Sequence, residues 1–547
     1  MKNSKHILFV KSIFVILILS VCFACCDDNK VPTIVVVKND ETYSPEKVRA
    51  VMDVWQKKTF DYFYAGASPT GMALEGNERG DVVTTGGSGF GVMALIVGAE
   101  RGWITREQSM TQIRKIVRFL GKAERFRGVW SHWYNPDGTA HPFGDQVKTG
   151  DLIETSFMMA GLLTAKEYFT GNSEIEAEIR DSVESFKNTI NWRFYTKNEN
   201  VLYWLWYSQE NRFALQIRGW NEGLICYILA LGAPEPHNIT PEVYANGWLN
   251  NGAIVHPERK HYGYTLPLGE TYGGPLFFAH YSFLGLNPFY LEDNEVNYWE
   301  QNLAHTLVNR HYCVYEAPAA YKYGESDWGL TACYGGRPPW NYSARSPQND
   351  DGVIAPTASL SSYPYTPFYS TQMLFRLSEY PLVHGSYGFA DAYSPETSTS
   401  EKKQLAIDQG PIVVMMENYR SGLIWNLLMK NADIKRALVL AGMKEQPAFS
   451  EGFLKTYINS QTKQYDMMRH PDREHYELEY FLNTEGDIRF KLNNASGQLA
   501  LDTVVVGNAG ENVFSFRNTN SVISGKQYTI KMITPGNKEY TLLVRLR

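Results

Sequence analysis

Three segments of the sequence place a carboxylate at the start of a stretch with helical character. They read Thr149-Gly150-Asp151-Leu152-Ile153-Glu154-Thr155, Arg218-Gly219-Trp220-Asn221-Glu222-Gly223 and Ile407-Asp408-Gln409-Gly410-Pro411. Each acid has a structural explanation, because carboxylates favour helix N-termini and Asp151 with Glu154 fits a capping box. Asp408 likewise fits the cap of a helix that begins with proline. Their neighbours, however, are Gly, Trp, Asn, Gln and Arg, types that bind sugar hydroxyls, so we expect these acids to converge on one cavity.

Cleavage of a glycosidic bond is the chemistry that such carboxylates could perform. It needs one protonated carboxyl group for the leaving oxygen and one ionised group, which an inverting enzyme places ~6.5–9.5 Å away to admit water. A helix N-terminus lowers a carboxyl pKa, so the acid needs apolar burial or a second carboxylate to raise it. Glu222, between Trp220 and an apolar stretch, has the better surroundings for the acid. Asp151 and Asp408 have more polar neighbours, which suit the base or a water-positioning role.

Aromatic residues form an unusual 14% of the chain, with 13 Trp and 35 Tyr. Core packing explains any single one better, but many lie in loops, and the set as a whole favours a groove of flat faces for sugar rings. Trp340 and Tyr342 belong to this loop set. The predicted substrate-binding residues are Glu154, Trp130, His132, Tyr134, Arg218, Trp220, Asn221, Tyr272, His280, Asp327, Arg345, Tyr365, Tyr387, Phe389, Gln409 and Trp425.

Other chemistries have little support in the sequence. Gly86-Gly87-Ser88-Gly89 lacks the lysine and the preceding strand of a phosphate-binding loop, and no Gly-x-Ser-x-Gly motif occurs. Pro257 interrupts the helix that zinc ligation by His256 and His261 would need. His280 is better explained as a core or rim residue than as a metal ligand. We therefore expect no cofactor and no metal. The net charge of −6 argues against nucleic acid as a partner and points to a neutral polymer.

Helical segments must position the acids. We predict helices near residues 45–64, 88–100, 105–124, 151–170, 173–192, 221–232, 241–251, 274–284, 295–311, 366–380, 396–406 and 411–429, and a rim hairpin at 129–138. Stretches that are apolar all round alternate with stretches that are charged on one face. This alternation predicts two concentric rings, a mainly α protein with an (α/α)6 toroid, rather than a simple bundle.

The remaining segments predict a tether and a tail. Residues 1–25 have a basic start and a short apolar run, and Ala24-Cys25-Cys26 resembles a bacterial lipobox, so Cys25 or Cys26 would be lipidated. Ordinary signal cleavage is the alternative. Residues 26–43 are a predicted linker, 44–445 the catalytic domain, 446–479 a connecting segment and 480–547 a small β-rich domain, with strands near 488–492, 503–506, 513–516, 528–532 and 540–544. We prefer a structural role for this tail over carbohydrate binding. Cys226, Cys313 and Cys333 are predicted to be buried thiols.

Several longer motifs carry a family resemblance. They are Asp151-Leu152-Ile153-Glu154-Thr155-Ser156-Phe157, Gly219-Trp220-Asn221-Glu222, Gly274-Pro275-Leu276-Phe277-Phe278-Ala279-His280-Tyr281-Ser282, Ala355-Pro356-Thr357-Ala358, His384-Gly385-Ser386-Tyr387-Gly388-Phe389 and Asp408-Gln409-Gly410-Pro411 through Trp425. Over about residues 45–445 the sequence resembles the bacterial glucoamylase-like family, which includes secreted endo-β-1,2-glucanases. The resemblance implies an (α/α)6 fold and inverting hydrolysis without a metal, with Glu222 as the general acid and Asp151 in the acidic group that serves the water.

One departure from the family pattern affects the acidic group. The glucanases carry a further Asp four residues before the first motif Asp, where this sequence has Val147, with Asp145 displaced by two. The sequence thus predicts a glucan hydrolase, endo-acting on β-1,2-glucan. Rival hypotheses are a non-catalytic glycan-binding lipoprotein, an exo-acting hydrolase of other linkage, and a polysaccharide lyase, which the negative charge disfavours. The expected location is the cell envelope, as an outer-membrane lipoprotein exposed at the surface or facing the periplasm. Its expected partners are a glucan, a membrane through the lipid alone, and other glycan-uptake proteins.

Overall fold

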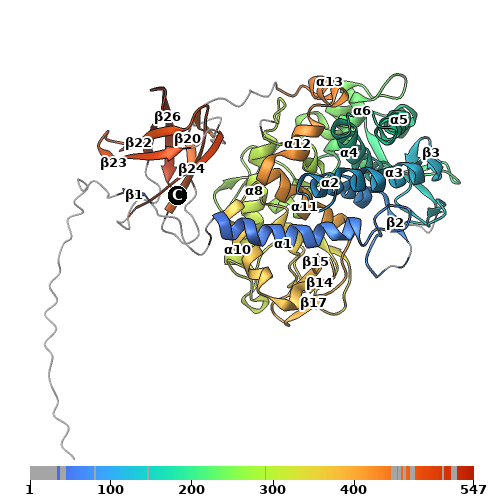
Figure 1. Cartoon of the computed structure of the whole chain (residues 1–547), viewed down its shortest axis with the longest axis horizontal. Coiled ribbons are helices and arrows are strands. Elements are labelled where there is room, and N and C mark those ends of the chain that lie inside the picture. The colour runs from blue at the N-terminus through green and yellow to red at the C-terminus, as the bar shows by residue number, and fades with distance from the viewer. Residues whose placement is uncertain are drawn as a thin grey trace, which may run out of the picture.

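The structure is a computed structural model that describes residues 34–36, 43, 45–78, 80, 82–143, 147–289, 291–444, 452–453, 458–459, 464–467, 475–507, 510–518 and 527–546. The predicted signal peptide with Cys25, and most of the predicted linker, lie outside these residues. Figure 1 shows a large helical body and a smaller strand-rich part that holds the C-terminus. Among the helices that the structure describes, none is long and apolar enough to cross a membrane.

The helical body is built from helices of two kinds. Its principal helices are α1 (Pro45–Tyr64), α2 (Thr85–Glu100), α3 (Arg106–Lys122), α4 (Leu152–Tyr168), α5 (Glu174–Thr189), α6 (Leu224–Gly232), α8 (Tyr298–His311), α10 (Pro367–Ser378), α11 (Ala406–Ser421), α12 (Leu423–Leu428) and α13 (Ala432–Leu440). Helices α2, α4, α6 and α11 are buried along most of their length, whereas α3 and α5 bury one stripe. They form the inner and outer rings of an (α/α)6 toroid, as the sequence predicts.

Glycines bring the inner helices into close contact. Helix α2 packs against both α4 and α11. A Cβ atom added at Gly89 would lie 2.4 Å from the carbonyl oxygen of Phe157 in α4, and one added at Gly161 would lie 2.2 Å from the carbonyl oxygen of Gly89. The glycine-rich start of α2 therefore serves the close approach of two helix backbones.

Some predicted helices are wrong in kind or in extent. Residues 396–405 form no helix but include strand β17 (Thr399–Glu401), which pairs with β16 (Ala392–Ser394), and only Ala406 is helical, as the first residue of α11. The segments 241–251 and 274–284 break into short turns, among them α7 (Pro241–Val243), η3 (Tyr244–Trp248), η6 (Leu276–Ala279) and η7 (Ser282–Leu284). Helix α11 begins five residues before the predicted start, and Gly422, with φ at +67°, separates it from α12. The sequence reasoning missed α9 (Pro356–Leu360) and α13.

Short hairpins lie between the helices. They include β3 (Arg125–Phe126) with β4 (Val129–Trp130), β2 (Val83–Thr84) with β5 (Trp133–Tyr134) and β6 (Ala140–His141), β7 (Thr149–Asp151) with β8 (Leu202–Tyr207) and β9 (Arg212–Ile217), β10 (Lys260–His261) with β11 (Tyr264–Thr265), β12 (Ala332–Cys333) with β13 (Ser343–Ala344), and β14 (His384–Gly385) with β15 (Gly388–Phe389). The predicted rim hairpin at 129–138 is wrong in its pairing, because β4 pairs with β3, whereas β5 pairs with β2 and β6. Cys226, Cys313 and Cys333 are buried and free, as predicted.

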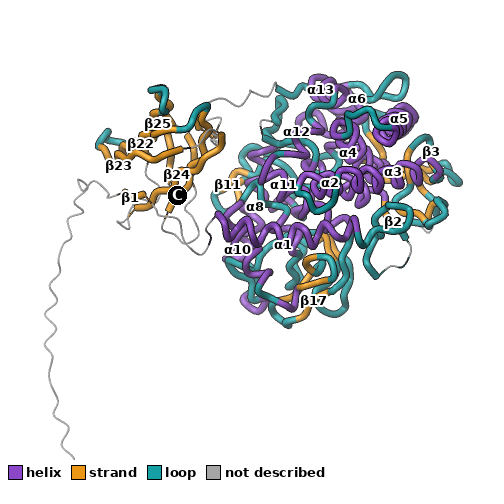
Figure 2. Tube along the Cα trace, viewed as in Figure 1, coloured by secondary structure: helices purple, strands orange, loops and turns teal. Residues whose placement is uncertain are grey.

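The strand-rich part contains all five predicted tail strands, as β22 (Gly486–Asn494), β23 (Leu499–Gly507), β24 (Gly510–Asn518), β25 (Gln527–Ile533) and β26 (Glu539–Leu546) (Figure 2). The predicted connecting segment adds β18 (Gly452–Phe453), β19 (Ile458–Asn459), β20 (Gln464–Met467) and most of β21 (His475–Leu482). Strand β1 (Ile34–Val36), from the predicted linker, pairs antiparallel with β24. The two sheets run β1-β24-β21-β18 and β19-β20-β26-β25-β22-β23. Tail and linker are therefore parts of one β structure.

Candidate active site

Asp151 ends strand β7, caps helix α4 and is fully buried. Its Oδ1 accepts hydrogen bonds from the backbone N–H of Glu154 at 3.0 Å and from the indole N–H of Trp204 at 2.8 Å. Its Oδ2 lies 2.8 Å from Nδ1 of His132. Since a carboxylate offers about four acceptor positions, the protein occupies three of them and leaves one for a water or a sugar hydroxyl.

Glu154 faces the start of α2 rather than its own helix N-terminus. Its Oε2 accepts the backbone N–H of Gly86 at 2.5 Å, so only the Asp151 half of the predicted capping box forms. A Cβ atom at residue 86 would lie 2.6 Å from this oxygen, which explains why glycine is needed there. Burial raises the pKa of Glu154 to about 7, although His132 opposes the rise.

His132 connects the two acids of α4. Its Nδ1 donates to Asp151, its Nε2 lies 4.0 Å from Oε1 of Glu154, and its ring stacks on Phe143 at a centroid distance of 3.8 Å. Burial lowers the pKa of His132, but Glu154 and Asp151 raise it by more, to about 9. The imidazole is therefore a cation at neutral pH, and it offsets part of the negative charge of the two acids.

Glu222 lies in the loop between β9 and α6 and exposes only 9% of its surface. Side chains around it shape the loop: Oδ1 of Asn221 accepts the N–H of Gly223 at 2.8 Å, and the hydroxyl of Ser282 donates to the backbone oxygen of Glu222. Burial raises the pKa of Glu222 to about 7, and the charge of Asp151 adds to the rise. A large fraction of molecules therefore keep Glu222 protonated at neutral pH, which a general acid requires.

Asp408 is paired with an acid that the sequence reasoning missed. It lies in the first turn of α11, with Pro411 inside the helix, so it is not the predicted cap before a proline. Asp408 and Asp391 expose 1% and 2% of their surface, and the carboxyl group of each is close enough to shift the pKa of the other. Burial raises the pKa of both, that of Asp391 to about 6. Two contacting carboxylates cannot both ionise easily, so the pair holds one proton at neutral pH.

Tyr281 and Glu75 link these groups. The Tyr281 hydroxyl donates to Oδ1 of Asp408 at 3.4 Å, and the charges of both Asp408 and Glu222 act on it. Glu75, which the sequence reasoning also missed, is partly exposed and is close enough for its charge to act on His132, Glu154 and Asp408. Its backbone oxygen accepts the N–H of Ala406, the first residue of α11. The acids of the three predicted segments are thus gathered into one cluster with Asp391 and Glu75.

The comparisons with known proteins bear on this cluster and its fold. Residues 214–432 match the family "Glycoamylase: Putative glucoamylase". The solved endo-β-1,2-glucanase of Chitinophaga pinensis, determined with sophorotriose and glucose, is 44% identical over 73% of this chain and 99% of its own, with a TM-score of 0.69. The chain belongs to the glucoamylase-like family.

Two further proteins resemble this glucoamylase-like chain, one in sequence and one in fold. An exo β-1,2-glucooligosaccharide sophorohydrolase (non-reducing end) of Parabacteroides distasonis is 37% identical over 427 residues, 73% of this chain; this chain spans 58% of the relative's length. An endo-β-1,2-glucanase of Talaromyces funiculosus, at 10% identity over 73% of this chain and 92% of its own with a TM-score of 0.52, shares the fold alone.

Most predicted aromatic ligands of the glucoamylase-like chain lie in its core. Trp130, Tyr134, Trp220, Tyr365, Phe389 and Trp425 expose between 0% and 7% of their surface. Several hold the fold through their polar ends, as when the Trp130 indole donates to the carbonyl of Leu120 and the Trp425 indole to that of Phe283. The expectation that the whole aromatic set forms a sugar groove is therefore wrong for these six residues. Tyr272 and Tyr387 are partly exposed.

The predicted polar ligands divide in the same way. His132, Glu154 and Asn221 lie at the acidic cluster, and Gln409 follows Asp408, with its amide donating to the carbonyl of Phe389 at 3.4 Å. Arg218 is exposed and donates to the backbone of Asn246, and Asp327 accepts from Tyr393. His280 is buried against the Ser362 hydroxyl, and Arg345 is bound by backbone carbonyls and Asp351. Asp145 lies outside the described residues, between Phe143 and Val147, which pair with each other.

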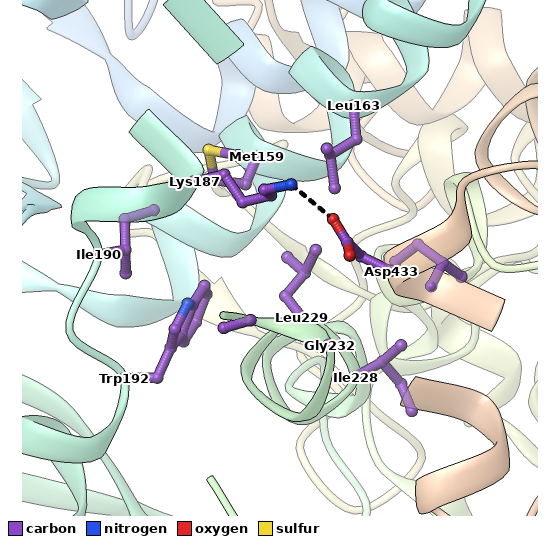
Figure 3. Close-up of a pocket in the computed structure, with 11 residues that line it drawn as sticks. Met159, Leu163, Lys187, Ile190, Trp192, Ile228, Leu229, Gly232 and Asp433 are labelled. Atoms are coloured by element: carbon purple, nitrogen blue, oxygen red, sulfur yellow. Dashed lines mark hydrogen bonds and ion pairs between the residues drawn. The ribbon is translucent and has the colours of Figure 1, made fainter. Parts of the chain in front are cut away.

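A separate apolar cavity of about 10 Å³ lies between α4, α5, α6 and α13 (Figure 3). Lys187 and Asp433 form an ion pair of 2.7 Å at its edge. A cavity of this size holds at most one water molecule, so it is a packing feature rather than a substrate site. Within the described ranges, no group of three or more His, Cys, Asp or Glu side chains is arranged to hold a metal ion.

Proposed function

We propose that the protein is a glycoside hydrolase that cleaves β-1,2-linked glucan at the acidic cluster, with inversion at the anomeric carbon. The carrying observation is Glu222, a buried carboxyl whose pKa is raised to about 7 beside the hydrogen-bonded carboxylate of Asp151. One group is suited to give a proton and the other to take one. The names of the relatives from Chitinophaga pinensis and Parabacteroides distasonis support β-1,2-glucan as the substrate.

In the proposed reaction Glu222 donates its proton to the oxygen that leaves as the C1–O bond breaks. A water attacks C1 from the opposite face and passes its proton to Asp151, through the acceptor position that the protein leaves open. His132 and Trp204 orient Asp151 for this step through their contacts with its two oxygens. Asp391 and Asp408 together hold one negative charge near the same sugar.

Hydrolysis of β-1,2-glucan, measured beside starch and other β-glucans, tests the proposal. We expect new reducing ends from β-1,2-glucan alone, and NMR of the first product should show the α-anomer, opposite to the β-linkage. Activity on none of these glucans would refute the proposal. Binding of β-1,2-glucan without any release of reducing ends would instead favour the non-catalytic glycan-binding lipoprotein.

Endo action is our first choice of cleavage pattern, because the relative with 44% identity, which this chain covers almost completely, is an endo-enzyme. Exo action is the second candidate, because the curated relative releases its product from the non-reducing end. The early products distinguish the two: a ladder of oligosaccharides indicates endo action, and a single disaccharide from the start indicates exo action.

We also propose that lipidation of Cys25 tethers the protein to the cell envelope, on the support of the lipobox-like run. Replacing Cys25 and Cys26 by Ala should move the protein from the membrane fraction to the soluble fraction. An unchanged membrane fraction would contradict this tether.

A further inference from the structure

The hairpin of residues 332–344 displays two aromatic side chains beside the acidic cluster. It consists of β12, a tip of residues 334–342, and β13. Trp340 and Tyr342 on the tip are 37% and 51% exposed, although most large aromatics of the helical body are buried. An exposed Trp and Tyr so close together lose the benefit of burial, and a ligand that covers them would restore it.

The base of the hairpin is bonded to the carboxyl pair. The backbone N–H of Tyr334 donates to Oδ2 of Asp391 at 2.7 Å, and the carboxyl groups of Asp391 and Asp408 act on each other's pKa. At the other end of the tip, the charges of Asp408, Asp391 and Glu75 reach the Tyr342 hydroxyl. The charges of the acidic cluster therefore act on Tyr342, although about half of this residue is exposed to solvent.

Buried contacts hold the tip rigid. Arg345, 1% exposed, donates to the carbonyl oxygens of Cys333, Tyr334, Ser343 and Asn341, and it forms a two-pronged ion pair with Asp351. A Cβ atom at Gly336 would lie 2.5 Å from the backbone of Tyr393. Tyr393 belongs to β16 and follows Asp391 by two residues, so the tip packs directly on this strand close to Asp391. Arg337 also pairs with Glu396. The role predicted for Arg345, donation to sugar hydroxyls, is thus replaced by anchoring of the hairpin.

Trp340 itself has an unfavourable backbone. Its φ of +61° lies in the left-handed region, which a bulky residue adopts only when its surroundings impose it. Such strain in a rigidly anchored turn collects at binding sites, because a functional side chain must be held there despite the cost. An exposed Trp at a backbone position that suits Gly indicates that the indole ring serves binding rather than folding.

We propose that the 332–344 hairpin forms a glucosyl-binding subsite next to the Asp391–Asp408 pair, in which Trp340 and Tyr342 stack on sugar rings of the β-1,2-glucan. The pyranose C–H faces lie against the two aromatic rings, and neighbouring carboxyl oxygens accept sugar hydroxyls. This subsite rests on the function proposed above. The hairpin would then determine how many glucosyl units are bound on one side of the cleaved bond.

Two substitutions test the subsite, Trp340→Gly and Tyr342→Ala, each made alone and also in the Glu222→Gln background. Calorimetry with β-1,2-gluco-oligosaccharides of increasing length should show roughly 3- to 10-fold weaker binding, confined to oligosaccharides long enough to reach the hairpin. In the active protein KM should rise while kcat changes little, because a stacking platform binds ground state and transition state alike. Trp340→Gly should also unfold at the same or a higher temperature than the wild type, since glycine accepts a positive φ.

Tyr315→Ala is the matched control, because Tyr315 is also 51% exposed but lies on η8 (Tyr312–Glu316), away from the acids. It should bind and hydrolyse like the wild type. If Trp340→Gly and Tyr342→Ala behave like Tyr315→Ala while the wild type cleaves β-1,2-glucan, the hairpin subsite is refuted and the proposed function stands. If the wild type neither binds nor cleaves β-1,2-glucan, both proposals fail together.

Discussion

Asp391 and Asp408 are both almost wholly removed from solvent, and the carboxyl group of each shifts the pKa of the other. Burial raises the pKa of both, so the folded protein holds protons that the unfolded chain releases near the ordinary carboxyl pKa. This contribution to stability is largest below the ordinary carboxyl pKa. It falls as the pH rises through about 6, the folded pKa of Asp391, and the part that belongs to the proton still held at neutral pH is lost only at higher pH.

Asp408→Asn therefore tests the shared proton. The amide N–H can donate to Asp391 as the protonated Asp408 does, so we expect a folded protein whose stability falls less than that of the wild type between pH 5 and 7. Denaturant unfolding at each pH measures this. Asp408→Ala leaves Asp391 buried without its partner and should cost about 1–3 kcal/mol. Equal pH slopes for Asp408→Asn and the wild type would contradict the shared proton.

Glu222→Gln should lower kcat by about 10²–10⁴-fold and leave oligosaccharide affinity nearly unchanged, because the amide keeps the shape and loses the proton. In the wild type, kcat/KM should fall as the pH rises above about 7, since Glu222 must be protonated to act. Stopped assays at a series of pH values measure this decrease in kcat/KM. Glu46→Gln, an exposed acid on α1, is the control and should keep the wild-type profile. Retained turnover by Glu222→Gln would remove Glu222 from the acid role.

His132→Asn should destabilise the protein more at pH 5 than at pH 8. The folded pKa of His132 is raised to about 9 from an ordinary value of 6.5, so the imidazolium stabilises the folded protein fully below pH 6.5. This contribution is lost as the pH rises through 9, so removing the imidazole should cost less at pH 8. His141→Asn, on the neighbouring strand β6, should show no such difference between the two pH values. A cost for His132→Asn that does not depend on pH would argue against the charge of His132.

Gly86→Ala and Gly121→Ala compare two helical glycines with different surroundings. At residue 86 a Cβ atom would lie 2.6 Å from the Glu154 carboxylate and 2.9 Å from Phe157, so we expect lower stability and weaker catalysis. At residue 121 the nearest atom is 3.9 Å away, so alanine should stabilise α3 by roughly 0.5–1 kcal/mol. Thermal unfolding of both variants checks this. If Gly86→Ala kept the stability and activity of the wild type, the Gly86–Glu154 contact would be shown to relax.

Much of the site could be predicted because the starts of helices can be recognised in the sequence. Asp151, Glu154 and Glu222 precede or open apolar helices, and the N-termini of the inner helices of a toroid open on one face. Asp391 and Glu75 carry no such signal, since both lie in loops and reach the cluster only through the fold. One hint was available: Asp391 is a single acid in the apolar run Phe389-Ala390-Asp391-Ala392-Tyr393.

The aromatic residues show where sequence reasoning fails. A loop position says that the backbone lies between elements, but it does not say whether the side chain points inward. Trp130 and Trp425 point inward and satisfy their indole N–H groups on carbonyls, whereas Trp340 points outward. Only the packing around each ring distinguishes an inward from an outward side chain. That packing involves residues outside the local sequence, such as Gly336 against Tyr393.

The pairing of β1 with β24 has a consequence for synthesis of the chain. Val36 lies opposite Phe516. Strand β1 is synthesised early and β24 late, so their sheet can form only after β24 has been made. The whole toroid is made in between and can fold in the meantime, because its own contacts are complete before β24 emerges. The sheet that contains β1 therefore closes only after β24 has been made, and a translation product that stops before β24 would leave β1 without this partner.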